Sequence, residues 1–193
     1  MSLDGFIGGP EQSLENPLGV GGMQLLQWQA SKDAADVAAL DELLGPMGAF
    51  VMGRNMFGPI RGPWSGDWRG WWGDTPPYHG PVFVLTSHDR DSIEMSGGTT
   101  FHFVTDGFQA ALDRARDAAG HRDVRVAGGA STVRQAFAAN AIDDLYLDLV
   151  PVTLGSGEAI FGRPLGASLT QLDLTHSTTC AHIRYRVGED QTG

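Results

Sequence analysis

The feature that most constrains the fold is a regular alternation of short apolar runs with helical patterns. Strands are predicted at residues 49–52, 81–86, 100–105, 123–127 and 144–152, and helices at 33–44, 106–119 and 131–139. Two further apolar runs, 169–175 and 180–187, predict a closing antiparallel hairpin. This order is typical of an α/β fold with a mixed, mostly parallel sheet that is flanked by helices.

Turn and capping residues predict where some strands and helices begin or end. Residues 1–9 predict the end of a strand that turns at Asp4-Gly5, and the strand is either short or begins upstream of Met1. Val37, Leu40 and Leu44 recur at helical spacing. Asp106, with Gln109 three positions later, predicts a capping box at the start of the next helix.

Composition narrows the class of protein. A chain of 193 residues fits one domain, residues 1–193, and no apolar run approaches the ~20 residues of a membrane span. The beginning of the chain shows no secretion signal. The single Cys180 excludes an internal disulfide framework and a cysteine-rich zinc site, so no metal is predicted and the cytoplasm is the expected location.

Charge limits the possible partners. The formal net charge of −10 opposes binding to nucleic acid and to anionic membranes, because both need Lys and Arg to neutralise phosphates. An anionic cofactor on such a protein must be held by local features, such as backbone amides at the start of a helix.

Gly128 and Gly129 lie between a predicted strand and a predicted helix. Glycine lets the backbone approach a ligand closely, and the first amides of the helix, with the hydroxyls of Ser131 and Thr132, can donate to a pyrophosphate. The alternative is a tight turn that binds nothing, because a lone pair of glycines is a weak motif and GxGxxG is absent here.

Two more strand ends carry polar groups. Arg54, after Gly53, supplies a planar charge suited to a phosphate, although a surface arginine paired to a carboxylate is commoner. The hydroxyls in residues 86–88 could hold a ribose phosphate, or the segment is a plain loop. Residues 151–157 form a glycine-containing loop after a strand, or a turn before the final hairpin.

These segments together resemble the dihydrofolate-reductase-like family that includes the reductase domain of bacterial riboflavin biosynthesis. The matching segments are MSLDGFI (1–7), VMGRNMF (51–57), PVFVLTSH (81–88), VRVAGGAS (124–131) and DDLYLDLVPVTLGSGEAIF (143–161). The resemblance implies a three-layer α/β fold, bound NADPH and a homodimer.

The resemblance also implies a set of cofactor-binding residues. These are Gly53 and Arg54 at the phosphates, Thr86, Ser87 and His88 near the adenosine ribose phosphate, Val104 and Thr105 beside the adenine, Gly128, Gly129, Ala130, Ser131 and Thr132 at the pyrophosphate, and Leu154 and Gly155 near the nicotinamide. A cationic and hydroxyl cluster at Arg54 and residues 86–88 fits the 2′-phosphate of NADPH.

Three aspartates are candidates for the proton donor. Dihydrofolate reductases carry a buried carboxylate on the first helix, but neither Asp33 nor Asp36 falls at the expected place, and both are interpreted as helix-start or solvated groups. Asp4 is the predicted catalytic residue, and its alternative is a turn-forming aspartate before Gly5. The zinc deaminase ligands that accompany riboflavin reductases are missing, so the chain is expected to be a stand-alone reductase module.

A loop rich in Trp, Gly and Pro spans residues 59–81. Its tryptophans could cover a pocket and stack on a planar heterocycle, or they could pack against the sheet or a dimer partner. Trp28, Phe57 and Trp64 are the candidate substrate-binding residues.

The predicted function is NADPH-dependent hydride transfer to a planar, pterin- or pyrimidine-like heterocycle. By resemblance this is similar to 5-amino-6-(5-phosphoribosylamino)uracil reductase of riboflavin biosynthesis. Two alternatives remain: a non-catalytic nucleotide-binding module, and a structural dimer of the same fold that has lost the pocket.

Overall fold

The computed structural model describes residues 1–58, 61–162 and 164–189. The chain divides into two compact units, and each is described by itself. Unit 1 combines Met1–Leu43 with Ala136–Gly193, and unit 2 is the continuous segment Leu44–Gln135. Among the described residues, no helix has the length and apolar character needed to cross a membrane.

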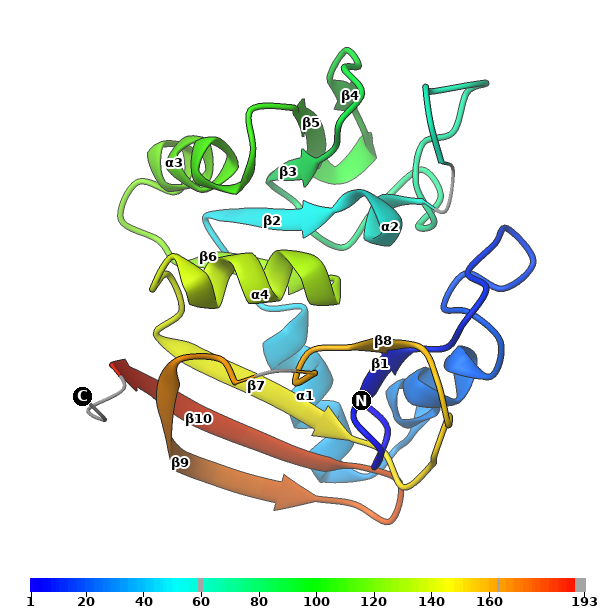
Figure 1. The fold of residues 1–193 in the computed structure, drawn as a ribbon, viewed down its shortest axis with the longest axis vertical. Helices are drawn as coiled ribbons and strands as arrows, with labels where there is room; N and C mark the ends of the chain where they lie inside the picture. Colours follow the sequence, from blue (N-terminus) through cyan, green and yellow to red (C-terminus); the bar gives the residue numbers. More distant parts are fainter. Residues whose placement is uncertain (59–60, 163, 190–193) are drawn as a thin grey trace. The chain divides into compact units, whose positions relative to one another are not determined.

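Unit 2 is built on a five-stranded sheet with the order β4-β5-β3-β2-β6 (Figure 1). Its strands are β2 (Ala49–Gly53), β3 (Pro81–Leu85), β4 (Ile93–Glu94), β5 (Thr100–Val104) and β6 (Val124–Gly128). β5, β3, β2 and β6 run parallel, and only the short β4 is antiparallel, to β5. The carboxyl ends of the four parallel strands therefore lie at one edge of the sheet.

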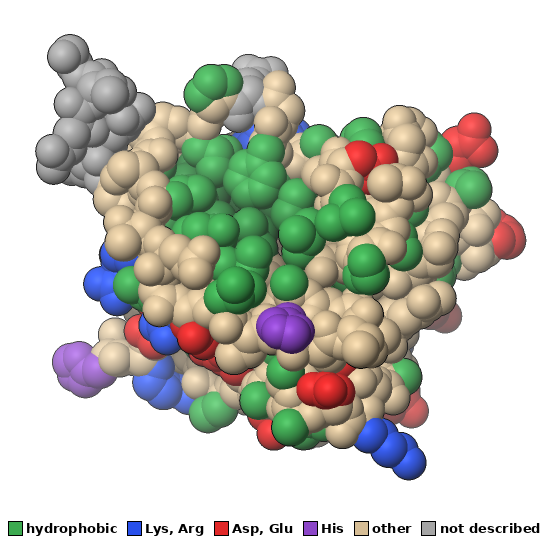
Figure 2. Space-filling view, turned by 90° about the horizontal axis from the view of Figure 1, so that it is seen from below, with side chains coloured by type: hydrophobic (Ala, Val, Ile, Leu, Met, Phe, Trp, Pro, Cys, Tyr) green, Lys and Arg blue, Asp and Glu red, His purple; other side chains and the backbone are tan. Residues whose placement is uncertain are grey.

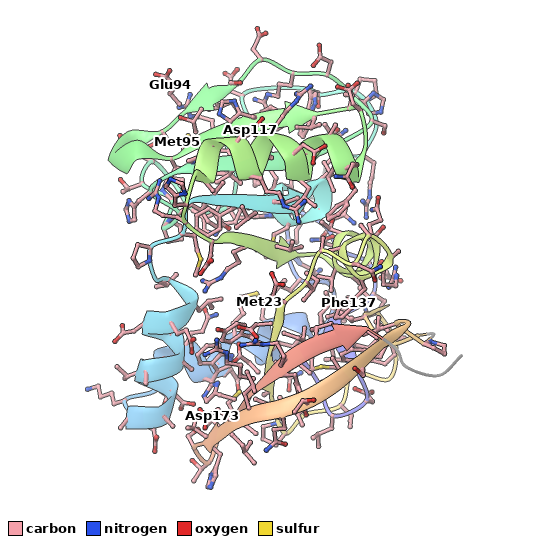
Figure 3. The ribbon with its side chains drawn as sticks, turned by 90° about the vertical axis from the view of Figure 1, so that its left-hand side faces the viewer. Met23, Glu94, Met95, Asp117, Phe137 and Asp173 are labelled. Atoms are coloured by element: carbon pink, nitrogen blue, oxygen red, sulfur yellow. The ribbon has the colours of Figure 1, made fainter. Side chains whose placement is uncertain are left out.

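Helix α3 (Phe108–Ala119) covers one face of this sheet. Its apolar residues Phe108, Ala111, Leu112 and Ala115 are buried, as the helical spacing predicts. Figure 3, where Asp117 marks α3 and Met95 marks the connection between β4 and β5, shows the helix alongside the strands. The predicted capping box is wrong. Gly107 is the N-cap residue, Gln109 bonds to Asp113, and Asp106 pairs with Arg114.

The tryptophan-rich loop packs against the unit 2 core. Trp64, Trp68 and Trp72 contact a cluster of buried strand residues, and Trp72 stacks on Phe101 with 5.8 Å between ring centroids. The indole of Trp68 donates to the carbonyl of Phe57. Of the two alternatives for this loop, burial against the sheet describes these tryptophans; residues 59–60 lie outside the described part of the chain.

Unit 1 contains an antiparallel sheet with the order β7-β10-β9 and a smaller β1-β8 pair. Its elements are β1 (Phe6–Gly8), a 3₁₀ helix (Gly22–Ala30), α1 (Ala34–Leu43), β7 (Asp144–Leu149), β8 (Glu158–Ala159), β9 (Ala167–His176) and β10 (Ala181–Glu189). The predicted C-terminal hairpin is confirmed by the β9–β10 pairing. The sequence analysis predicted no element at the 3₁₀ helix.

The register of the three-stranded sheet separates an apolar face from a polar one. Leu147, Ile183 and Leu174 lie opposite one another across the strands, so they share a face. The other face of the sheet is polar and carries Asp148 opposite His182. Asp36 of α1 forms a hydrogen bond with His182 on this face.

The short helix α2 (Arg54–Phe57) follows β2 directly, and α4 (Ala130–Ala138) follows β6. These two junctions, strand to helix, position the groups described next.

Candidate functional site

Four strand ends of unit 2 form a common rim. β2 ends at Gly53, β3 at Leu85, β5 at Val104 and β6 at Gly128. The amide of Thr86 donates to the carbonyl of Val104 over 3.1 Å, which extends the pairing of β3 and β5 past the end of β3. Segments that are separated by up to 75 positions in the sequence thus lie side by side.

Gly53 and the turn after β6 are in close contact. A Cβ atom on Gly53 would lie 2.7 Å from the Thr132 hydroxyl oxygen and 3.6 Å from the Gly129 nitrogen. The contact of 2.7 Å is too close for any residue but glycine unless Thr132 moves, whereas 3.6 Å is an ordinary van der Waals distance. Gly128 has φ +125°, a conformation that side chains rarely adopt, so glycine is required there as well.

The turn itself is open at Gly129. A Cβ atom built at Gly129 meets nothing within 4 Å, and its backbone lies outside the left-handed region. α4 begins at Ala130, so the amides of Ala130, Ser131 and Thr132 belong to the first helical turn, where N–H groups have no partner within the helix. This arrangement, an open glycine before a helix start, can accept an anion.

Arg54 lies at the same rim with part of its hydrogen-bonding capacity unused. Its Nη1 donates to Thr86 Oγ1 over 3.3 Å, and its guanidinium carbon lies 3.7 Å from the centre of the Trp64 ring. Nε and Nη2 are buried, and neither has a hydrogen-bond partner among the described residues. Burial lowers the pKa of Arg54, and the charges of Arg61 and Arg90 lower it further.

These arginines form a local cluster of positive charge on an acidic protein. Arg90 also lies over the Trp64 ring, at 5.0 Å from its centre. An anion bound here would satisfy the free donors of Arg54 and reduce the repulsion among the three cations. The donor set therefore fits a phosphate group.

The remaining predicted cofactor residues of unit 2 differ in exposure. Ser87 and Thr105 are exposed at the rim, and His88 is half-buried with its carbonyl bonded to the Trp64 indole. Val104 is only 1% exposed, so its side chain belongs to the core and not to a surface beside an adenine. Its carbonyl, not its side chain, is what reaches the rim.

Asp4, the predicted catalytic residue, holds a loop in unit 1. Its carboxylate accepts bonds from the amides of Leu154 and Gly155, the latter over 2.6 Å. Hydrogen bonding to Ser2, and then to Gly155, lowers the pKa of Asp4. A carboxylate of lowered pKa that already accepts two amides is poorly suited to donate a proton. Leu154 and Gly155 lie in unit 1 with Asp4.

Two predicted substrate-binding residues are core residues. Trp28 is 2% exposed and packs with Leu25 and Val150, while Phe57 is 0% exposed and packs between Phe101 and Phe103. Neither ring is accessible to a ligand, because the surrounding core residues cover it. Trp64, which is partly exposed and lies on Arg54, is the one of the three that borders the rim.

Unit 1 also contains a buried polar cluster that the sequence analysis missed. Asp36 is 1% exposed, and it bonds to His182 Nε2 over 2.9 Å and to the Thr179 hydroxyl over 3.0 Å. His182 Nδ1 lies 2.8 Å from the Asp148 carboxylate. Asp36 does lie in the first turn of α1, but the alternative that it is solvated is wrong. Asp33 accepts the Ala35 amide at the helix start.

Burial and hydrogen bonding shift the pKa values of the residues in this cluster. Burial raises the pKa of Asp36, but bonds from Ser31, His182 and other donors outweigh burial and lower the pKa to about 2. Burial lowers the pKa of His182, yet the hydrogen bonds of Asp148 and Asp36 raise it overall. Cys180 lies beside them, and burial raises the pKa of its thiol to about 12. The signal in the sequence was a cysteine two positions before a histidine, Cys180-x-His182, at the start of a predicted strand.

Solved structures share this fold. A putative riboflavin biosynthesis protein from Shewanella sp. PV-4 aligns with a TM-score of 0.65 and 20% identity, over 98% of this chain and 96% of that one. A dihydrofolate reductase from Enterococcus faecalis, complexed with NADP(H) and RAB-propyl, aligns with a TM-score of 0.53 and 14% identity, over 98% and 93% of the two chains. The fold is therefore dihydrofolate-reductase-like.

Longer proteins contain the same fold as one part. A Thermotoga maritima diaminohydroxyphosphoribosylaminopyrimidine deaminase/5-amino-6-(5-phosphoribosylamino)uracil reductase aligns with a TM-score of 0.53 and 12% identity, over 96% of this chain and 54% of that one. The chain thus spans about half of that protein.

Sequence comparison gives one short match and one long match. A lipopolysaccharide core biosynthesis glycosyltransferase, LpsD, from Rhizobium meliloti (strain 1021) is 39% identical over 70 residues, which are 36% of this chain and 19% of that protein. The chain spans only about a fifth of LpsD, and the match carries no functional argument. By contrast, residues 1–182 match the model of the RibD C-terminal domain. The chain belongs to the RibD C-terminal domain family.

Proposed function

We propose that this protein is a cytoplasmic, NADPH-dependent reductase that transfers hydride to a planar, pterin- or pyrimidine-like heterocycle. Its family membership supports a reductase, and so do the names of two proteins of the same fold, one a dihydrofolate reductase complexed with NADP(H) and one a uracil reductase. The reaction would be similar to that of 5-amino-6-(5-phosphoribosylamino)uracil reductase.

The observation that carries the proposal is a pair of buried Arg54 nitrogens at the rim of unit 2, for which the described part of the chain offers no hydrogen-bond partner. Leaving a buried donor unsatisfied costs roughly 1–3 kcal/mol, and more for a charged group. An arginine in this state is typical of a site that is completed by an anionic ligand. The open Gly129 turn on the same rim supplies a second place for a phosphate group.

NADPH would supply the hydride when bound. The residues of this chain would hold and orient it: the guanidinium of Arg54 and the Thr86 hydroxyl at one phosphate, and the first amides of α4 at the pyrophosphate. Asp4 is proposed as a positioning residue for the loop at Leu154 and Gly155, and not as the proton donor.

Fluorescence titration tests the proposal. Trp64 stacks on Arg54, so a phosphate bound to Arg54 should change the emission of Trp64. We expect saturable quenching at micromolar NADPH, and a smaller change in a Trp64→Phe variant. A flat titration would count against cofactor binding. Saturable binding without NADPH oxidation across pterin, pyrimidine and carbonyl substrates would instead indicate the non-catalytic module.

Replacement of Arg54 should weaken NADPH binding selectively. Hydrogen bonds to charged groups contribute about 1.5–3 kcal/mol, so Arg54→Ala is expected to raise the Kd for NADPH roughly 10- to 100-fold. The Kd for NADH should change less, because it lacks the 2′-phosphate. The exposed Arg116→Ala on α3 is the matched control for loss of one positive charge. Equal losses for both nucleotides would contradict a 2′-phosphate site at Arg54.

We further propose a homodimer that uses the apolar face of the β7-β10-β9 sheet. Leu169 and Leu174 of β9, opposite Val187 and Ile183, are 40% and 50% exposed, and Leu172, at the bulge between them, is 47% exposed. Figure 2, which views the molecule from below, shows hydrophobic side chains gathered into one patch. A shallow hollow of about 450 Å³ adjoins Leu169 and is lined partly by Phe161 and Leu165. Exposed apolar patches of this kind mark interaction surfaces.

The oligomeric state tests this face. Leu172→Glu combined with Leu174→Glu should convert a dimer into a monomer in analytical ultracentrifugation, because each buried charge would lack a partner. Thr170→Glu adds the same charge on the polar face, opposite Arg186, and should leave the dimer intact. A monomeric wild-type protein, or dissociation by Thr170→Glu alone, would contradict the proposal.

A further inference from the structure

We propose that unit 1 contains a binding site for a divalent transition metal of the zinc type, formed by Asp148, Cys180 and His182. The site lies wholly within unit 1, and it does not depend on the proposed reductase function. It uses side chains to which the cofactor proposal gives no role.

The backbone brings the three side chains to one place. His182 of β10 lies directly opposite Asp148 of β7, so their side chains share a face of the sheet. Cys180 lies in the turn directly before β10, two positions before His182. The thiol sulfur, an imidazole nitrogen and a carboxylate oxygen lie within 4.8 Å of one another. Tetrahedral zinc, with bonds of about 2.0–2.3 Å, holds its ligand atoms roughly 3.3–3.8 Å apart, so the side chains would have to close by up to about an ångström around the ion.

The donor set suits a borderline-soft cation. Sulfur and imidazole nitrogen favour zinc-like ions over magnesium or calcium, and a carboxylate completes many zinc sites. Three protein ligands leave one coordination position for water or another small ligand. The side chain of Asp148 is 31% exposed, which gives an ion a route from solvent.

Asp36 supplies the outer support that metal-binding histidines need. It bonds to His182 Nε2 over 2.9 Å and is itself held by the Thr179 hydroxyl. This carboxylate–histidine contact fixes the ring with Nδ1 directed to Asp148, at 2.8 Å. A metal ion would replace that Nδ1 to Asp148 hydrogen bond with two coordinate bonds.

Apolar residues close the other side of the cluster. The Trp28 ring meets His182 edge-on, with 5.0 Å between ring centroids. Leu25, Val150 and Cys180 belong to the same buried cluster. A shell of this kind limits access of water and strengthens the attraction between a cation and its ligands.

Cobalt(II) is the probe for this site. Cys180 is the only cysteine in the chain, so a thiolate-to-cobalt charge-transfer band in the near ultraviolet reports on this residue alone. We expect the EDTA-treated full-length protein to develop that band, with visible tetrahedral bands, up to one equivalent of Co²⁺. Zn²⁺ should then remove both. A folded wild-type protein that shows no charge-transfer band with stoichiometric Co²⁺ overturns the proposal.

Variants separate the site from adventitious binding. Cys180→Ser should abolish the charge-transfer band, and Asp36→Asn should weaken Co²⁺ binding about 10- to 100-fold, as loss of an outer-shell partner does elsewhere. His176→Gln, which removes an exposed histidine of the same hairpin, should leave the band and the affinity unchanged. Circular dichroism confirms that each variant is folded. Unchanged Co²⁺ affinity in folded Cys180→Ser and Asp36→Asn proteins overturns the proposal.

Discussion

Gly129→Leu is expected to abolish NADPH binding while the protein still folds. A Cβ atom at Gly129 meets no other atom within 4 Å, so the fold has room for the new side chain. That room is where a pyrophosphate would approach the first amides of α4. Loss of two amide bonds to a charged group, at about 1.5–3 kcal/mol each, corresponds to roughly a 1,000-fold weaker Kd.

The measurement is isothermal titration calorimetry, with thermal unfolding as the test of folding. Gly162→Leu is the matched control, because a Cβ atom at Gly162 also meets nothing within 4 Å. It should bind NADPH as the wild type does. If Gly129→Leu binds NADPH normally, the turn after β6 does not hold the cofactor, and the proposed function loses its phosphate site.

Phe57→Ala is expected to cost about 3–5 kcal/mol of the free energy of unfolding. Phe57 is completely buried and meets Phe101, Phe103 and Trp64 edge-to-face, with centroid separations of 5.0, 5.2 and 5.8 Å. Truncation would leave a cavity and remove these aromatic contacts. The loss should appear as a lower urea midpoint.

The same variant distinguishes a core residue from a pocket wall. A core role predicts that the fraction of Phe57→Ala that remains folded binds its ligands with ordinary affinity. Leu14→Ala serves as the control, since Leu14 is 54% exposed and its truncation should change the free energy of unfolding little. A stable Phe57→Ala protein with altered substrate KM would restore the substrate-binding role for this residue.

Much of the fold could be predicted from local patterns. Continuous apolar runs in the sequence correspond to β2, β3, β5 and β6. Each run is followed by residues that disfavour a strand. Because the strands are parallel, their ends had to meet at one edge of the sheet. The family resemblance placed Gly53, Arg54, Thr86 and Gly129 at one cofactor site, and the structure brings them to the same rim of unit 2.

Long-range polar contacts could not be predicted in this way. α1 was assigned an apolar face through Val37, Leu40 and Leu44, yet Val37 and Leu44 are 43% and 48% exposed, and Asp36 is buried. A periodicity argument counts only apolar residues, whereas Asp36 is buried because His182 and Thr179 bond to it from more than 140 positions away.

The sequence also did not determine which short-range hydrogen bonds the polar side chains form. Asp106 and Gln109 match the capping-box spacing, but the flexible Gly107 takes the N-cap position and releases both side chains to pair elsewhere. Similarly, the sequence could not show whether Trp28 and Phe57 face a ligand or a core, because both outcomes need the same aromatic residue.

The discontinuous make-up of unit 1 has a consequence for synthesis on the ribosome. Unit 2 is one continuous segment and can fold as soon as it emerges, whereas Leu25, Trp28 and Asp36 must wait for partners near Cys180 and His182. At about 5–20 residues per second, that delay is roughly 7–30 s. During this interval the nascent chain displays unburied apolar groups, which makes its first forty residues a natural place for a chaperone to bind.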